Sequence, residues 1–167
     1  MNLFDLLLES SKKLIEEVKM LNYEKINEKP ALDKWSISQI CHHLYLSEKL
    51  FTKAIENGLK DKDYESVVHK PIHLVSDRFQ KFESPEIAKP SEDPLEVETI
   101  LNFLTESREN LLNVLRAIDD KSILSKKVSN HPAFGELSLE QWIELLYLHE
   151  QRHIEQIKDV KLSKSFG

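Results

Sequence analysis

Two histidines of this chain are spaced one helical turn apart. His149 and His153 are separated by three residues, which places both imidazoles on one face of a helix, where they can chelate a single metal ion. Trp142, Leu146 and Ile157 share an arc of about 80° with the pair, so both rings are predicted to point into an apolar core. An unsatisfied buried polar group costs roughly 1–3 kcal/mol. We therefore predict that the pair binds a metal ion; hydrogen-bonded core histidines are the alternative.

The segment Cys41-His42-His43 offers a third ligand. His43 falls on the apolar face of its predicted helix, whereas His42 falls on a more polar side. Cys41 lies about 200° around the helix from His43, so it is predicted to be a buried small hydrophobe and not a ligand of the same ion. The predicted metal ligands are His43, His149 and His153.

Three neutral histidines leave at least one coordination position of a divalent ion open. A structural zinc site is usually closed by four protein ligands rich in cysteine, so this set is typical of a catalytic centre. An open position can bind water or a thiol and lower its pKa, which produces a nucleophile at neutral pH. Imidazole ligands suit zinc, nickel, iron and cobalt, so the set does not fix the metal. The histidines at 69, 73 and 131 are predicted to lie in connections, although His131 could cover the site.

Residues 149–153 also match the H-E-x-x-H motif of zinc proteases. Such a protease needs a third ligand, usually downstream of the second histidine, and a sheet that lines the substrate cleft. The carboxylate that follows His153, Glu155, lies about 200° around the helix from it, and no strand-rich region is evident. We therefore do not predict a protease, and Glu150 is assigned no role as a base.

Four amphipathic helices are predicted to position these residues, and the fold class is all-α. Their apolar spacing predicts helices over residues 2–26, 36–57, 93–118 and 138–160. A long crossover over residues 59–92 means that helices 2 and 3 need not be antiparallel neighbours. Residues 119–137 form a second long link. The sequence therefore predicts a four-helix bundle with a long crossover between helices 2 and 3, as a single domain over residues 1–167 with a loose tail from about residue 161.

Local signals predict where these helices begin and end. Ser36 and Ser138, each followed three residues later by glutamine, form capping boxes at two of the starts. Asp93, followed by Pro94, is the predicted N-cap of the third helix. Gly58 is predicted to stop the second helix at its C′ position.

The composition excludes several classes of protein. Three glycines, where about 12 are expected, leave little material for hairpins, phosphate loops or dinucleotide folds. One cysteine excludes a disulfide-held secreted domain. A net charge of −6 argues against a nucleic-acid or anionic-membrane surface. No apolar run approaches the roughly 18 residues of a membrane span, and no signal peptide is readable, so we expect a cytoplasmic protein.

Two stretches of the sequence match a known family pattern. Residues 35–44 resemble the W-[ST]-x-x-Q-[IV]-x-x-H-L stretch of the DinB-like (DinB/YfiT) superfamily of metal-binding four-helix bundles. Residues 131–142 resemble its H-P-x-F-G-x-[LM]-[ST]-x-x-[QE]-W motif, and residues 149–156 its H-x-x-x-H-x-x-Q motif. The motifs span most of the chain in the expected order, and their combination is more specific than either part alone.

The resemblance implies a divalent metal, often nickel or zinc, held by His43, His149 and His153, the same set that helical phase selects. It also implies frequent homodimers. Members have been described as metal-dependent hydrolases, as thiol S-transferases acting with bacillithiol or mycothiol, and as thiol-dependent isomerases; several have no known reaction.

The leading hypothesis is a metal-dependent enzyme that joins a low-molecular-weight thiol to an electrophilic small-molecule substrate, with hydrolysis by metal-bound water as its close variant. A non-catalytic metal-binding stress-response bundle and a bundle without metal are the alternatives. Since Cys41 is out of phase with His43, any thiol must come from outside the chain. The general acid or base is left open among Tyr45, Glu48, Tyr147, Glu150 and Gln156, which lie near the ligands in sequence.

Overall fold

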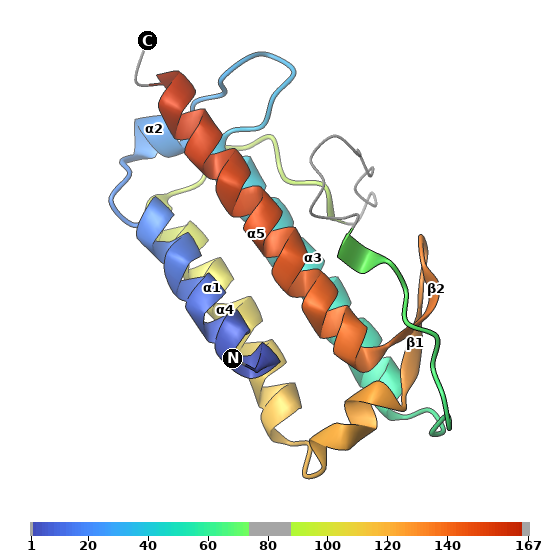
Figure 1. The fold of residues 1–167 in the computed structure, drawn as a ribbon. Helices are drawn as coiled ribbons and strands as arrows, with labels where there is room; N and C mark the ends of the chain where they lie inside the picture. The colour runs from blue at the N-terminus through green and yellow to red at the C-terminus, as the bar shows by residue number, and fades with distance from the viewer. Residues whose placement is uncertain (1, 74–87, 165–167) are drawn as a thin grey trace.

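Four long stretches with helical apolar spacing fold into long helices in a computed structural model, which describes residues 2–73 and 88–164 (Figure 1). The long helices are α1 (Leu3–Val18), α3 (Ile37–Leu59), α4 (Val97–Arg116) and α5 (Leu139–Lys164). The shorter elements are α2 (Tyr23–Asn27), the 3-10 helix η3 (Lys121–Ser125) and the strands β1 (Val128–His131) and β2 (Gly135–Ser138). The predicted helical bundle with a long crossover is confirmed.

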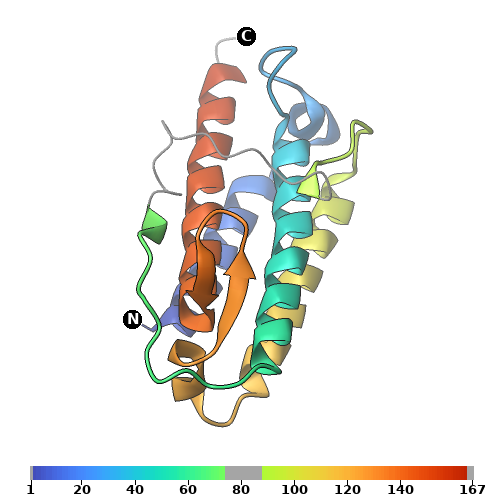
Figure 2. The same cartoon turned by 90° about the vertical axis from the view of Figure 1, so that its right-hand side faces the viewer.

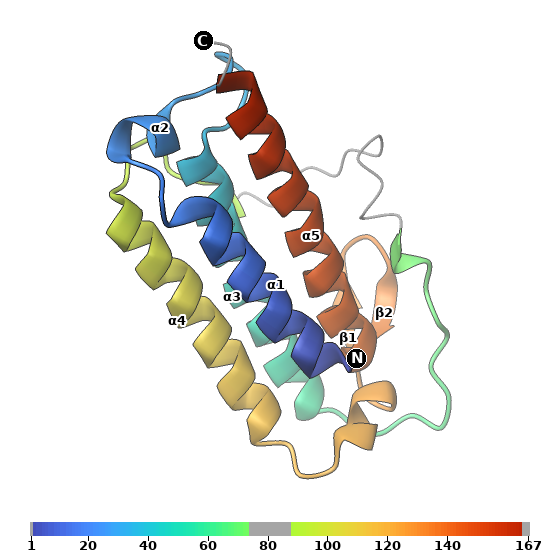
Figure 3. The same cartoon turned by 60° about the vertical axis from the view of Figure 1, so that its left-hand side comes forward.

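The crossover between α3 and α4 changes the direction of the chain within the bundle. Figure 1 and Figure 3 show α1 and α5 running in one direction and α3 and α4 in the other. Helix α3 packs against α4 and α5, and α1 packs against α5 and α4. Two pairs of neighbouring helices are therefore parallel, an arrangement that a short connection between α3 and α4 would not allow.

A buried polar layer separates two apolar clusters along the bundle. One cluster contains Leu7 of α1 and Leu111 of α4, and the other contains Leu14 of α1 and Leu104 of α4. Between these positions lie buried polar side chains that include Arg108. The bundle therefore has two hydrophobic cores and one charged layer at mid-height.

The first predicted helix is wrong as one continuous element. Helix α1 ends at Val18, and Asn22 then caps α2 by accepting a hydrogen bond from the Lys25 backbone N–H at 2.8 Å. Asparagine is a strong N-cap because its short side chain satisfies a free backbone donor of the first turn. This cap starts a new helix inside the stretch that apolar spacing alone joins together.

The start of α4 also differs from the prediction. Asp93 does not cap this helix; its N-cap is Glu96, which makes no side-chain capping bond. The side-chain amide of Asn27 holds the backbone of Leu95, donating to its carbonyl at 2.9 Å and accepting from its N–H at 3.0 Å. A tertiary contact thus keeps Leu95 outside the helix, against the local signal.

Gly58 is not a helix stop, because α3 continues through it to Leu59. A Cβ atom at this position would lie 2.8 Å from the carbonyl oxygen of Val128 and 2.5 Å from Cδ2 of Leu139. Real Cβ atoms do not approach backbone so closely, so glycine is what allows α3 to lie against β1 and the start of α5.

The second long link contains a hairpin, although the low glycine count predicts little material for one. Strands β1 and β2 pair antiparallel, with His131 opposite Gly135, and Gly135 has the positive φ of 73° that the end of this short turn requires. Figure 2 shows the hairpin lying lengthwise in front of the bundle, along the C-terminal half of α3 and the N-terminal half of α5. A single glycine at position 135 is sufficient to form this hairpin turn.

The predicted capping box at Ser36 forms, since Gln39 N–H donates to Ser36 Oγ at 3.1 Å and Ser36 N–H donates to Oε1 of Gln39 at 3.0 Å. At Ser138 only one half of the predicted box is seen: Gln141 N–H donates to Ser138 Oγ at 3.1 Å, but Oε1 of Gln141 accepts from the backbone N–H of Lys70. Helix α5 runs to Lys164, so residues 161–164 are helical and not a loose tail, whereas residues 165–167 lie outside the described part. Within residues 2–73 and 88–164, no helix combines the length and apolarity needed to cross a bilayer.

Candidate metal centre

The three predicted ligands meet between α3 and α5. Nε2 of His149 lies 3.2 Å from Nε2 of His43 and 3.2 Å from Nε2 of His153. One ligand atom from each residue lies within 4.8 Å of the other two. Helix α5 supplies two rings at the i, i+4 spacing, and α3 supplies the third from its buried face, as helical phase predicts.

In two of these histidines, the ring nitrogen that faces away from the group, Nδ1, lies beside an oxygen atom that can only accept a hydrogen bond. Nδ1 of His43 lies 2.8 Å from the carbonyl oxygen of Ala88, and Nδ1 of His153 lies 2.7 Å from Oε1 of Gln156. Each Nδ1 must therefore donate, which leaves the Nε2 lone pair of both neutral rings directed toward the third histidine. Such hydrogen bonds fix the tautomer and ring orientation of metal-ligating histidines.

Burial at the site favours the neutral form of two of the three imidazoles. Burial lowers the pKa of His149 well below its ordinary value, and the neighbouring rings of His153 and His43 and the charge of Arg152 lower it further. Burial also lowers the pKa of His43, against the hydrogen bond to Ala88. Nδ1 of His149 is buried without a hydrogen-bond partner among the described residues. Neutral rings are the form that coordinates a metal ion.

Aromatic side chains pack against two of the three rings. The Trp35 ring lies 5.1 Å from His43, and the Phe51 ring is stacked 6.2 Å from His149. Trp142 packs edge-on against Phe51 at 5.3 Å, and His131 of the hairpin lies 5.0 Å from Trp142. The surroundings of the centre are therefore apolar on at least two sides. His131 contacts Trp142 and not the three rings themselves.

The other histidines are bound elsewhere in the structure. Nδ1 of His42 accepts a hydrogen bond from the Ser91 backbone at 3.0 Å, on the half-buried side of α3. His69 contacts the Gln141 side-chain amide, and His73 lies in the connection after α3. Nδ1 of His131 accepts from the backbone N–H of Ala133 at 3.0 Å. None of these four is part of the three-histidine group.

Each of the five candidates for the general acid or base has another contact in the structure. Tyr45 stacks on Phe103 with ring centroids 4.4 Å apart, Tyr147 packs partly buried against an apolar cluster, and Gln156 is engaged by His153. Glu48 and Glu150 both bind the buried guanidinium of Arg108 at 2.6 Å. The carboxylate of the H-E-x-x-H string is thus held in an ion pair within the bundle.

Sequence reasoning missed Arg108 and the two serines, Ser10 and Ser107, that donate to its carboxylate partners. Burial alone would lower the pKa of Arg108, but the two carboxylates raise it above its ordinary value, so the guanidinium remains charged. The signal was present in the sequence, because Arg108 falls in the same apolar stripe as Leu104 and Leu111. An arginine at such a position requires buried anionic partners.

Cys41 is buried, as predicted, and lies outside the three-histidine group. Burial raises the pKa of its thiol to about 12, and the charge of Glu150 contributes in the same direction. This thiol is therefore protonated at neutral pH and is a poor nucleophile.

A family model described as the DinB superfamily matches residues 6–157. The chain is 30% identical over 145 residues to the uncharacterized protein YuaE of Bacillus subtilis (strain 168), a match that covers 87% of this chain and 88% of YuaE.

Two solved structures share the fold. YfiT from Bacillus subtilis, described as a probable metal-dependent hydrolase with an unusual four-helix bundle topology, matches with a TM-score of 0.68 at 17% identity, over 98% of this chain and 86% of YfiT. TT2238, described as a four-helix bundle protein, matches with a TM-score of 0.63 at 17% identity, over 94% of this chain and 96% of TT2238.

Proposed function

This chain belongs to the DinB superfamily, and we propose that it is a metal-dependent enzyme that acts on small molecules. His43, His149 and His153 are the proposed ligands of a divalent transition ion, with zinc and nickel as the first candidates.

The convergence of three Nε2 atoms carries this proposal. The lone pairs of His43 and His153 both face Nε2 of His149, at the distances that place the three atoms around one point. One N–H of His149 can satisfy only one of these acceptors well, and the other donor beside them, the Ser47 hydroxyl, lies 3.4 Å from Nε2 of His43, near the limit of a hydrogen bond. A cation at their centre satisfies all three rings. The donor set and the fixed tautomers therefore fit a divalent metal.

Each residue around the ion has a defined part in this function. Ala88 and Gln156 orient the rings of His43 and His153 through their Nδ1 protons. Trp35 and Phe51 exclude water on two sides and supply apolar surface for a substrate. When bound, a divalent ion with an open position would lower the pKa of a coordinated thiol or water.

Thiol transfer is the reaction that we propose first. The buried thiol of Cys41 is protonated and lies outside the ligand group, so the sulfur comes from a low-molecular-weight thiol such as bacillithiol. Glu48 and Glu150, the two carboxylates that the sequence leaves open as a general base, are both bound to Arg108. This favours a nucleophile acidic enough to ionise without a general base, and a thiol meets that condition better than water.

A conjugation assay tests thiol transfer. Chlorodinitrobenzene and a thiol are incubated with metal-loaded protein; the new C–S bond replaces the C–Cl bond, chloride leaves, and the thiol proton passes to solvent. We expect conjugation above the uncatalysed rate. Absence of any increase with several thiols, bacillithiol included, contradicts thiol transfer.

Hydrolysis is the second candidate, and the description of YfiT as a probable metal-dependent hydrolase favours it. The two reactions differ in one requirement, because hydrolysis of an ester or amide substrate needs no thiol. Activity that persists in thiol-free buffer would select hydrolysis. A loaded protein inactive with both substrate classes would instead favour the non-catalytic metal-binding bundle.

Metal content tests the proposed site itself. Protein purified without an affinity tag is expected to contain a transition metal or to take one up tightly, and His149→Ala is expected to abolish binding. The matched control is His42→Ala, which removes a half-buried histidine of α3 that is outside the ligand group. Less than about 0.2 equivalents of metal in the wild-type protein, without tight uptake on reconstitution, would refute the three-histidine site.

Two further parts of this proposal concern partners. The family resemblance predicts a homodimer, which light scattering of the purified protein tests. The net charge of −6 supports the absence of a nucleic-acid surface, and a gel-shift assay with duplex DNA at low salt is expected to show no complex.

A further inference from the structure

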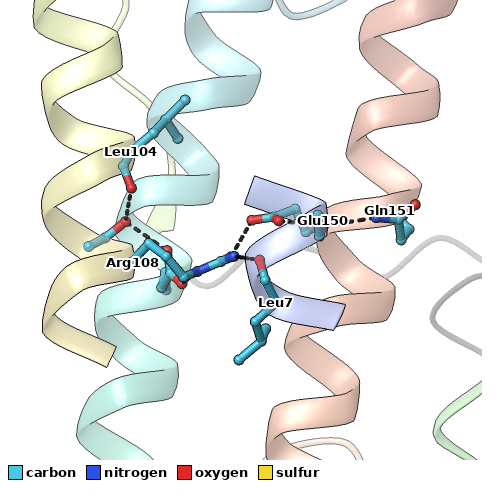
Figure 4. Close-up of polar contacts among 8 residues, drawn as sticks. Leu7, Leu104, Arg108, Glu150 and Gln151 are labelled. Atoms are coloured by element: carbon cyan, nitrogen blue, oxygen red, sulfur yellow. Dashed lines mark hydrogen bonds and ion pairs between the residues drawn. The ribbon is translucent and has the colours of Figure 1, made fainter. Parts of the chain in front are cut away.

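The charged layer at mid-height of the bundle joins all four long helices. Arg108 of α4 donates from Nε to Glu48 of α3 at 2.6 Å and from Nη2 to Glu150 of α5 at 2.6 Å, as Figure 4 shows in part. Its Nη1 donates to the carbonyl oxygen of Leu7 in α1 at 2.5 Å. All three charged side chains are buried. One guanidinium thus ties together three other helices.

Both carboxylates of this layer are saturated. The second oxygen of Glu48 accepts from Ser107 Oγ at 2.7 Å, and the second oxygen of Glu150 accepts from Ser10 Oγ at 2.5 Å. Ser10 in turn accepts from the side chain of Gln151 at 2.8 Å. A buried polar network in which every oxygen has a partner permits one arrangement of its helices and penalises others.

The layer lies on the two helices that carry the metal ligands. Glu150 follows His149 directly and precedes His153 by three residues, so it projects from the same two turns of α5. Glu48 stands five residues after His43, on the adjacent turn of α3. Arg108 therefore bridges the two ligand-bearing helices at the level of the histidines.

The rotation of these helices determines whether the ligands converge. Rotating a helix by about 10° moves an atom about 6 Å from its axis by about 1 Å. Metal–ligand distances agree to within about 0.2 Å in well-formed sites. Apolar packing between helices tolerates shifts larger than the roughly 0.2 Å that a metal site allows, because hydrophobic side chains can repack at nearly constant volume.

We propose that Arg108 is a positioning residue for the metal centre: by binding Glu48 and Glu150 it fixes the rotation of α3 and α5 and so brings His43 into register with His149 and His153. This inference rests on the proposed metal site. The role of the charged layer is then to place the ligand atoms accurately and not to stabilise the bundle. Replacing a buried ion pair with apolar residues often leaves stability unchanged or raises it.

The test separates positioning from stability. A triple variant, Glu48→Met, Arg108→Met and Glu150→Met, replaces the charges with apolar side chains of similar length, and Ser107 retains its bond to the Leu104 carbonyl at 3.3 Å. The control is Leu115→Ala, which removes a buried side chain of α4 outside the layer. For each protein we measure the free energy of unfolding of the metal-free form in urea, the affinity for Co²⁺ and the visible ligand-field spectrum of the Co²⁺ form.

The expected result is a triple variant as stable as the wild type that binds Co²⁺ at least about tenfold more weakly, with altered ligand-field bands. Leu115→Ala is expected to be less stable but to keep the wild-type affinity and spectrum. Wild-type affinity and spectrum in the folded triple variant would overturn the proposal, as would an equal loss of affinity in Leu115→Ala. If the triple variant does not fold, Glu150→Gln is judged by the same criteria. Failure of the wild-type protein to bind Co²⁺ would instead refute the metal site.

Discussion

The hydrogen bond between His153 and Gln156 allows a quantitative test of the proposed centre. Oε1 of Gln156 lies 2.7 Å from Nδ1 of His153 and holds its Nε2 lone pair toward the other two rings. The substitution Gln156→Leu keeps the volume but removes the acceptor. His153 can then adopt the other tautomer or rotate, and either change withdraws its lone pair from the site.

The expected loss of metal affinity is larger than the expected loss of stability. Removing a hydrogen-bond partner of a ligating histidine reduces metal affinity by about 10–100-fold, or roughly 1.4–2.7 kcal/mol of binding free energy. A single neutral hydrogen bond contributes about 0.5–1.5 kcal/mol to the stability of the metal-free fold. The two quantities are measured by competition with a chromophoric zinc chelator and by urea denaturation of the metal-free protein.

The control is Glu155→Gln, which changes an exposed neighbour on the same helix whose ion pair with Lys158 contributes little to stability. We expect wild-type zinc affinity in this control. Zinc affinity within about twofold of wild type in Gln156→Leu would refute the argument that the tautomer of His153 organises the site.

Three other predictions follow from contacts in the fold. Gly58→Ala is expected to lower the free energy of unfolding by about 1–3 kcal/mol in urea denaturation, because its Cβ would collide with the Val128 carbonyl, although alanine gains about 1 kcal/mol of helix propensity. Asn27→Ala is expected to lower it by about 1–3 kcal/mol, since both backbone groups of Leu95 lose their partner; an unchanged midpoint would contradict this. Cys41 is expected to resist a thiol reagent at pH 8 in the folded protein and to react at once in denaturant, because its folded-state pKa of about 12 keeps it protonated; rapid reaction of the native protein would show an accessible thiolate.

The sequence predicts the bundle and the convergence of the three histidines because both depend on helical period. His43, His149 and His153 lie where 100° per residue places them, and the cap at Ser36 depends on local chemistry alone. These features need no knowledge of what the helices pack against.

The errors arise where distant residues decide the local structure. Asn27 holds Leu95 out of α4, and the nearby carbonyl of Val128 leaves no room for a side chain at position 58. In both cases the partner is far away in the sequence. The Arg108 layer combines both situations: an arginine in an apolar stripe indicates buried partners, but the identity of those partners depends on how the helices assemble. The long connection between α3 and α4 predicts a crossover, but it does not predict which side chains of the four helices meet.

The distance along the chain between the partners of the charged layer also constrains how the protein is made. Ser10 and Glu150 are 140 residues apart. At a translation rate of roughly 5–20 residues per second, Glu150 of α5 is therefore synthesised about 7–28 s after Ser10 of α1. During synthesis the buried side chains of α1 have no α5 to pack against, and slow, non-local closure is expected compared with a bundle of sequential hairpins. His43 waits in the same way for His149 and His153, so a metal ion held by all three can be loaded only after α5 has left the ribosome.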